Sequence, residues 1–214
     1  MNYFKVILDL IFPEHCLSCK NNGTILCENC LLKISQSRET PNNYIISVFD
    51  YKDPIIKKVI KMFKYKNKRG LANILAKPLN DKLLEEISDL GIFENFKNPI
   101  LIPIPLSRKR LKERGYNQSE LLAKELVLLN KDFKMQTDIL FKTRETKSQA
   151  SIKNRNERLN NLKDCFSIKN KELIKNKNII LIDDIVTTGS TIKEARNILK
   201  SNGARKIIAL TVAH

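Results

Sequence analysis

Tryptophan is absent from the 214 residues, and glycine and proline are scarce, at 6 and 7 residues. Such low contents exclude collagen-like and low-complexity chains, and 42% hydrophobic residues are enough to build a packed core. No uninterrupted apolar run approaches the roughly 18 to 20 residues that cross a bilayer. We therefore expect a soluble protein of one ordinary domain plus a small one, without membrane insertion.

Acidic residues are also few, because 23 aspartates and glutamates accompany 39 lysines and arginines and leave a formal charge of +16. Such an excess favours polyanionic partners, namely nucleic acid, phosphate esters or a membrane surface, and charge alone does not select among them. Histidine is limited to His15 and His214, and neither stands in a catalytic pattern. The function must therefore be sought in other residues.

The first 16 residues contain a lysine and a short apolar run, so a secretory signal peptide has to be considered. Asp9 interrupts the run, and Glu14 and His15 stand where a cleavage site would have small residues. We therefore predict a short amphipathic helix instead. Five cysteines in a chain without an export signal indicate a reducing compartment, and the expected location is the cytoplasm.

Four of the five cysteines form two CxxC pairs that are separated by seven residues. A two-residue gap lets one tight turn direct both thiolates at the same ion, and two such turns complete a tetrahedral, structural zinc site. A redox CxxC pair and an iron–sulfur cluster are the alternatives, but redox chemistry needs one pair rather than two. The predicted zinc ligands are Cys16, Cys19, Cys27 and Cys30. Cys165 is predicted to be a buried thiol without chemistry.

The chain divides at a polar, proline-containing stretch, residues 36–43, and we place the boundary near residue 45. The predicted domains are 1–45, an N-terminal helix and zinc ribbon, and 46–214. In the second domain, runs typical of buried strands alternate with helical patterns, which indicates a parallel sheet covered by helices and therefore an α/β fold. The charged stretch 142–164 is long for a tight connection and is predicted to be a mobile loop that runs into a helix and closes over a site.

Two helices are predicted before the alternating region. Asp53 is expected to be an N-cap, with Pro54 as the first helical residue and apolar residues following at helical spacing. A second helical pattern covers 71–90. Pro78 is expected to break or kink this helix, and Gly91 is expected to end it.

The most informative stretch runs from Ile179 to Thr191, where a predicted buried strand is followed by Asp183, Asp184 and a hydroxyl-rich turn. Open α/β sheets bind ligands at the carboxyl ends of their strands, where these carboxylates would lie. The turn supplies backbone N–H groups, hydroxyls and a helix N-terminus, which together suit a phosphate monoester. The two acids suit a ribose diol, or a magnesium ion through water. An acidic turn with a threonine-rich helix cap is the alternative without a ligand.

This stretch resembles the phosphoribosyl-pyrophosphate (PRPP) signature of type I phosphoribosyltransferases. Together with the cysteine pairs and three further motifs, the chain resembles the ComF family of competence proteins, which includes GntX-type proteins, over nearly its whole length. The resemblance implies a phosphoribosyltransferase fold with a parallel sheet core behind a small zinc ribbon with four cysteine ligands. It also implies a role in handling single-stranded DNA in naturally transformable bacteria. The three motifs are PIPL at 103–106, RGYNQ at 114–118 and KSQA at 147–150.

Carried over by position, the resemblance assigns the two acids to the ribose hydroxyls of PRPP, with magnesium accompanying the ligand. The 5-phosphate would lie on the turn and the pyrophosphate on the loop after the PIPL strand. The residues implied are Asp183, Asp184, Thr187, Thr188, Gly189, Ser190 and Thr191, together with Pro105, Leu106 and Ser107.

Basic residues gather in two regions, 51–70 and 108–163. Lysines and arginines follow a nucleic-acid backbone, and exposed tyrosines can stack on bases. The same cations would also fit pyrophosphate oxygens, and a solvated lysine face is the alternative for 51–70. Phe63 falls on the apolar helical face and is predicted to be core. The residues predicted to bind nucleic acid are Lys61, Lys64, Tyr65, Arg69, Arg108, Lys109, Arg110 and Arg114.

Two functions follow from these observations. The favoured one is a PRPP-binding ComF-type protein that binds single-stranded DNA during uptake, with competence or DNA-processing proteins as further partners. The alternative is an active phosphoribosyltransferase that transfers ribose 5-phosphate from PRPP to an unidentified base or nucleotide. Its chemistry would be displacement of pyrophosphate, with magnesium and cationic side chains stabilising the departing charge. The sequence identifies neither an acceptor nor a catalytic residue.

Overall fold

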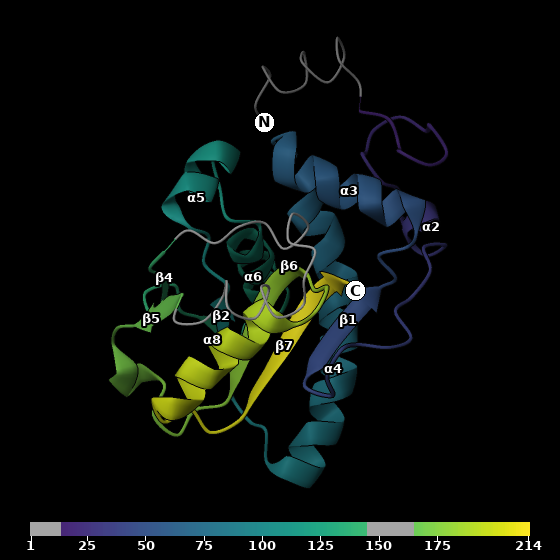
Figure 1. Ribbon diagram of the computed structural model, residues 1–214. Coiled ribbons are helices and arrows are strands. Elements are labelled where there is room, and N and C mark those ends of the chain that lie inside the picture. Colours follow the sequence, from purple (N-terminus) through teal and green to yellow (C-terminus); the bar gives the residue numbers. More distant parts are fainter. Residues whose placement is uncertain (1–13, 145–164) are drawn as a thin grey trace.

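The computed structural model describes residues 14–144 and 165–214, and its centre is a parallel β-sheet (Figure 1). The strands in the described residues are β1 (Ile45–Phe49), β2 (Ile100–Pro103), β3 (Lys134–Met135), β4 (Leu140–Lys142), β5 (Phe166–Ile168), β6 (Ile179–Ile185) and β7 (Ile207–Ala213). Five of them form the main sheet in the order β1-β7-β6-β2-β3, and each neighbouring pair is parallel. β4 and β5 form a small antiparallel pair. The parallel sheet core is the predicted one.

Helices cover both faces of the sheet. The helices in the described residues are α2 (Glu28–Leu31), α3 (Pro54–Tyr65), α4 (Leu71–Glu94), α5 (Arg108–Arg114), α6 (Gln118–Leu129) and α8 (Ser190–Ser201), with a short 3-10 helix η2 (Lys171–Leu173). α4 and α6 pack on one face and α8 on the other, while α3 and α5 lie beyond the carboxyl ends of the strands (Figure 1). This arrangement leaves the carboxyl edge between α3 and α5 for a ligand.

Alternate residues of β6 point to opposite faces of the sheet and join two separate buried clusters. Ile180 and Ile182 belong to the cluster that contains α4 and α6. Ile179 and Leu181 belong to the cluster that contains α8. Because each of these side chains is fully buried, each stabilises the fold by about 1.5 to 3 kcal/mol. Burial on both faces explains why the strand sequence is almost continuously apolar.

The start of α3 follows the sequence prediction. The Asp53 Oδ1 atom accepts hydrogen bonds from the backbone N–H groups of Ile55, at 2.8 Å, and Ile56, at 3.3 Å, and Pro54 is the first helical residue. Phe63 is fully buried, as its place on the apolar face predicted. α3 is therefore held at both ends, by its cap and by an aromatic anchor in the core.

α4 departs from the prediction at its end, because it continues through Gly91 to Glu94; it also continues through Pro78, so the helix is not broken there, and the predicted kink stays a prediction. The predicted stop at Gly91 is wrong. The residue that ends the helix is Asn95, in the left-handed conformation with φ 51°. Burial of a leucine face against the sheet and α6 outweighs the roughly 1 kcal/mol that an internal glycine costs, and it also outweighs the larger cost of an internal proline.

Residues 14–35, which we call the cysteine ribbon, pack directly on the main domain. Cys16, Leu26 and Leu31 belong to the same buried cluster as Phe49 of β1 and Val59 of α3. At the surface an ion pair joins Glu28 to Lys77, with 2.8 Å between the carboxylate oxygen and Nζ. The ribbon and the main domain therefore share one core. The predicted domain division near residue 45 stays a prediction.

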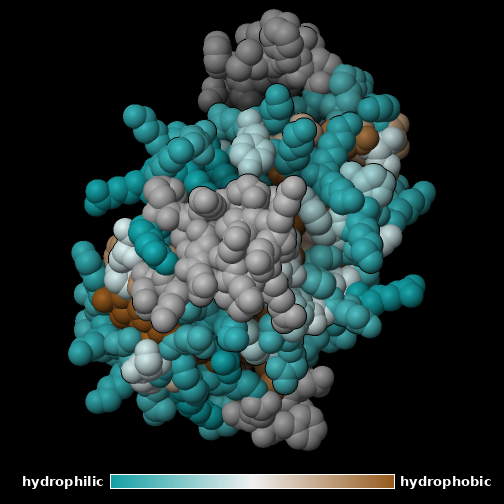
Figure 2. All heavy atoms as spheres, viewed as in Figure 1, coloured by the Kyte–Doolittle hydropathy of each residue, from teal (hydrophilic) through white to brown (hydrophobic). Residues whose placement is uncertain are grey.

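Several predicted features lie outside the described residues. They are the N-terminal amphipathic helix, the KSQA motif at 147–150 and most of the predicted mobile loop 142–164. Within the described ranges, no helix is both long enough and apolar enough to cross a membrane. Hydrophilic side chains cover most of the described surface that Figure 2 shows.

Candidate functional site

A cavity of about 700 Å³ lies at the carboxyl edge of the sheet. β2 and β6 are neighbours in the sheet, with Pro103 paired to Ile182, so the segments that follow them open side by side. α3, α5, the first turn of α6, Tyr51 and Lys142 contribute further walls. Of the residues assigned to PRPP, the cavity is lined by Asp183, Asp184, Thr187, Thr188, Gly189, Ser190, Thr191, Pro105 and Leu106. Two distant segments of the chain thus contribute to one site.

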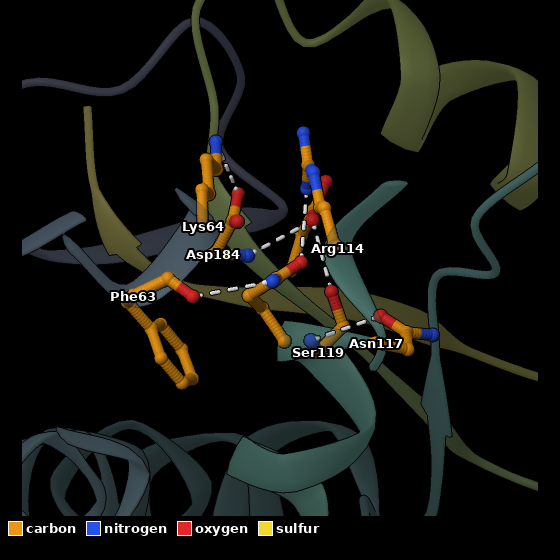
Figure 3. Close-up of polar contacts among 8 residues, drawn as sticks. Phe63, Lys64, Arg114, Asn117, Ser119 and Asp184 are labelled. Atoms are coloured by element: carbon orange, nitrogen blue, oxygen red, sulfur yellow. Dashed lines mark hydrogen bonds and ion pairs between the residues drawn. The ribbon is translucent and has the colours of Figure 1, made fainter. Parts of the chain in front are cut away.

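The acidic pair lies at the end of β6 and has defined partners (Figure 3). The Asp184 Oδ1 atom forms an ion pair with Lys64 Nζ of α3 at 2.9 Å, and the two side chains are only 7% and 15% exposed. The Asp183 Oδ1 atom accepts hydrogen bonds from the Ser119 hydroxyl, at 3.1 Å, and from the Asp184 backbone N–H, at 2.9 Å. The pair is therefore held from two other elements, α3 through Lys64 and α6 through Ser119.

Burial, and next to it the adjacent Asp184 carboxylate, raise the pKa of Asp183 to about 7, although Lys64, the Asp184 backbone N–H and the Ser119 hydroxyl oppose the shift. The main cause is that the Asp183 carboxyl is removed from water, and the second is the like charge of Asp184 beside it. A ligand that brings hydrogen-bond donors or positive charge to the pair would favour its ionised form.

The hydroxyl-rich turn leads into the N-terminus of α8. Gly189 has φ +72°, a conformation that other residues rarely adopt. A Cβ atom there would lie 3.2 Å from Asn42 Nδ2 and 3.3 Å from Pro41 Cγ, so the connector after the cysteine ribbon contacts this turn. The hydroxyl oxygens of Thr188 and Ser190 are 2.6 Å apart. The turn is thus a tight loop at a helix N-terminus, as an anion site requires.

The segment after β2 is only partly in the cavity. Pro105 and Leu106 line it, whereas Ser107 is not among the lining residues and is 3% exposed. The Ser107 Oγ atom caps α5, because it accepts a hydrogen bond from the Arg110 backbone N–H at 3.4 Å. This position gives Ser107 a structural part in placing α5, and its predicted contact with pyrophosphate stays a prediction.

The residues predicted to bind nucleic acid divide into two groups. Five of them line the same cavity as the acidic pair, while Arg69, Arg108 and Lys109 are exposed and do not line it. Three more lining residues have matching chemistry: Tyr51 and Lys57, which belong to the basic region 51–70, and Lys142. The five that do line the cavity are Lys61, Lys64, Tyr65, Arg110 and Arg114.

Arg114 and Tyr65 form a small platform at the cavity wall. The guanidinium carbon of Arg114 lies 5.3 Å from the centre of the Tyr65 ring, and its Nη1 donates to Gln118 Oε1 at 2.9 Å. Tyr65 is 64% exposed, so one part of the ring remains accessible. A cation and an exposed aromatic ring side by side suit both phosphate and base contacts.

Sequence reasoning missed Ser119, which holds Asp183. The residue in the sequence that could have pointed to Ser119 is Asn117. Its Oδ1 accepts a hydrogen bond from the Ser119 backbone N–H at 3.1 Å, and its Nδ2 donates one to the Ile104 carbonyl oxygen at 3.0 Å. These two bonds fix the start of α6 beside β2. A polar residue in the first turn of a helix at the carboxyl edge is a reasonable candidate for any α/β site.

The four cysteines of the ribbon form a second candidate site, for a metal ion. Their sulfur atoms all lie within 4.8 Å of one another, and the Cys19 and Cys27 sulfurs are 3.7 Å apart. Zinc–sulfur bonds of about 2.3 Å in a tetrahedron place sulfurs about 3.8 Å apart, so the cluster can hold zinc. In the described residues every cysteine is free of disulfides. Cys165 is fully buried, and burial raises the pKa of its thiol, as expected of a core thiol.

Residues 72–214 match the family model "Phosphoribosyl transferase domain". This match covers most of the sheet and the whole of the segment from Asp183 to Thr191. The chain therefore belongs to the phosphoribosyltransferase-domain family.

Relatives of the chain place it, within this family, in the ComF group of competence proteins. Competence protein F of Haemophilus influenzae is 29% identical over 95% of this chain and 84% of its own length. Competence protein ComFC of Bacillus subtilis is 32% identical over 78% of this chain and 62% of its own. DNA utilization protein YhgH of Escherichia coli K12 is 26% identical over 90% of this chain and 85% of its own. These matches confirm the resemblance inferred from sequence.

Proposed function

We propose that the cavity at the carboxyl edge binds PRPP or a closely related phosphoribosyl ligand. The observation that carries the proposal is the meeting, around one cavity of about 700 Å³, of the acidic pair, the hydroxyl-rich turn and several cations. The turn and the N-terminus of α8 supply N–H groups and hydroxyls for the 5-phosphate. Asp183 and Asp184 supply acceptors for the ribose hydroxyls.

The pyrophosphate of PRPP would lie toward Pro105, Leu106 and the cations of α3 and α5, with Mg²⁺ as its counter-ion. Arg110 and Arg114 both line this part of the cavity, and guanidinium groups suit phosphate oxygens. When bound, the magnesium ion would offset the charge of the pyrophosphate. The residues of the chain then have the separate task of orienting the ribose and keeping the phosphates in place.

We further propose that the protein acts on single-stranded DNA during its uptake, in the cytoplasm. Two of the relatives named above are competence proteins and a third is a DNA utilization protein, and the described surface carries many exposed lysines and arginines. Tyr65 beside Arg114 offers a base and a phosphate contact at the cavity wall. The protein would therefore combine a phosphoribosyl pocket with a nucleic-acid surface.

The pocket assignment predicts that replacing both acids by amides abolishes PRPP binding. In the Asp183→Asn/Asp184→Asn protein, the amide oxygens accept hydrogen bonds more weakly than carboxylates, so we expect a loss of affinity of at least about a hundredfold, or roughly 3 kcal/mol. Isothermal titration calorimetry with PRPP and Mg²⁺ measures this loss.

The matched control is Asp132→Asn, an exposed carboxylate that does not line the cavity, and it should leave PRPP affinity unchanged. Circular dichroism has to show that the double variant is folded. Equal PRPP affinity of the double variant and the wild type would refute the pocket. PRPP binding accompanied by pyrophosphate release, with a base or nucleotide added, would identify the protein as an active transferase.

A further inference from the structure

Lys64 occupies an unusual position for a residue of a lysine-rich helix. Phe63, its neighbour in sequence, is fully buried, and the Phe63 carbonyl oxygen accepts hydrogen bonds from the Tyr116 hydroxyl and from Gln118 Nε2, the latter at 3.2 Å. These bonds fix the last turn of α3 to the segment between α5 and α6. Lys64 is thereby directed at the acidic pair rather than at solvent (Figure 3).

The ion pair between Lys64 and Asp184 differs from a surface ion pair. Its two side chains are 15% and 7% exposed, whereas Lys57 and Lys61, on the preceding turns of the same helix, are exposed. Removing an ammonium group from water is costly, and a buried pair is a poor means of stabilising a fold. A lysine that is mostly withdrawn from water at the wall of a ligand cavity therefore points to a role toward the ligand.

Charge and hydrogen-bond capacity define that role. Asp183 and Asp184 bring two adjacent carboxyl groups, and Lys64 is the ammonium group paired with them. An ammonium group has three N–H donors, and the Asp184 carboxylate occupies one of them. Within the described contacts the other two are available to a bound anion, while the carboxylates keep lone pairs for a ribose diol. A cation between an acidic pair and a phosphate is the arrangement that a divalent metal ion otherwise provides.

Resting on the proposed function, we propose that Lys64 is a built-in cation that links the acidic pair to the pyrophosphate group of the phosphoribosyl ligand. It supplies part of the charge compensation that would otherwise require Mg²⁺. PRPP binding by this protein is then only weakly dependent on a divalent cation, and Lys64 is a binding residue of the pocket.

The test compares PRPP affinity with Mg²⁺ and in excess EDTA, by calorimetry, for the wild type, Lys64→Met and Lys61→Met. We expect the wild type to lose less than about tenfold in EDTA, and Lys64→Met to lose more than about a hundredfold and to recover most of its affinity with Mg²⁺. Lys61→Met removes the same charge from the same helix and the same cavity wall. It should weaken binding by a similar factor in both conditions, because Lys61 is exposed and is not paired with the acids in the described contacts.

Equal metal dependence of the Lys64→Met and Lys61→Met proteins would overturn the proposal. A wild-type protein whose PRPP affinity falls a hundredfold or more in EDTA would also overturn it. If the Lys64→Met protein does not fold, this wild-type measurement by itself tests the proposal. Absence of PRPP binding by the wild type even with Mg²⁺ would instead refute the proposed function itself. The two failures are therefore distinguishable.

Discussion

At the scale of single residues, the acidic pair is where local chemistry departs most from the behaviour of free side chains. Asp183 is held by Ser119, while its neighbour Asp184 is paired with Lys64. Neither partner adjoins the pair in sequence, since Ser119 lies in the first turn of α6 and Lys64 in the last turn of α3. The protonation of the pair is consequently a property of the assembled fold.

The raised pKa of Asp183 predicts how the stability of the ligand-free protein depends on pH. A carboxyl group with an ordinary pKa near 4 in the unfolded chain and about 7 in the fold holds a proton that the unfolded chain has already released. This contribution is complete below about pH 4 and is lost as the pH rises through 7, with a slope of at most about 1.4 kcal/mol per pH unit.

Urea unfolding between pH 5 and 8 should therefore show the wild type losing stability relative to Asp183→Asn. An asparagine at this position retains an oxygen that can accept from Ser119, so the comparison isolates the titration. The stability of the Asp132→Asn protein should change with pH in the same way as that of the wild type. If the stabilities of the wild type and of Asp183→Asn also change with pH in the same way, the pKa of Asp183 is not raised in the fold.

At the scale of elements, we expect the cysteine ribbon to depend on a bound metal ion, because its buried side chains join the core of the main domain and form no separate core in the described residues. We expect mass spectrometry under native conditions to find one zinc per chain. Replacing Cys16 and Cys19 by serine should release the metal. It should also lower the melting temperature of the whole protein by several degrees, since Cys16 and Leu26 are part of the main core.

Cys165→Ala is the matched control for this experiment, because it removes a cysteine outside the ribbon and should leave the zinc content at one. A wild-type protein that contains no metal and two disulfides would rule out the zinc site. Iron in place of zinc would support the iron–sulfur alternative.

Most elements could be predicted from the sequence because their signals are local. The strand that carries Asp183 begins with a run of apolar residues, and the cap at Asp53 is set by the residues that follow it. The end of α4 could not be predicted, because Gly91 is a common stop and only packing carries the helix past it. The ion pair of Lys64 could not be predicted either, since it depends on where α3 lies over the sheet.

At the scale of the whole molecule, the charge of +16 predicts salt-sensitive binding of single-stranded DNA. If about five phosphates are contacted, affinity should fall about a hundredfold between 50 and 200 mM salt. Fluorescence anisotropy of a labelled oligonucleotide measures this fall. PRPP should weaken the binding, because five of the residues predicted to contact nucleic acid line the cavity proposed for PRPP.

The location of the DNA can be tested with charge-matched pairs of substitutions. Lys61→Ala with Arg114→Ala removes two cations from the cavity wall, and Lys134→Ala with Lys171→Ala removes two that do not line it. We expect only the first pair to lower the affinity strongly and to reduce the salt slope. Equal losses in both pairs, or DNA binding that PRPP leaves unchanged, would place the DNA on the outer surface.

The position of β7 in the sheet has a consequence for how the protein is made. β7 follows all the other strands in sequence, yet it lies between β1 and β6 and is the parallel neighbour of both. During synthesis the edge of β1 that pairs with β7 stays unpaired while more than half of the chain is made. Truncation before residue 207 would leave this edge and the matching edge of β6, both apolar, open to other chains. Ribosome stalling late in the message would therefore yield aggregating fragments rather than a partly active protein.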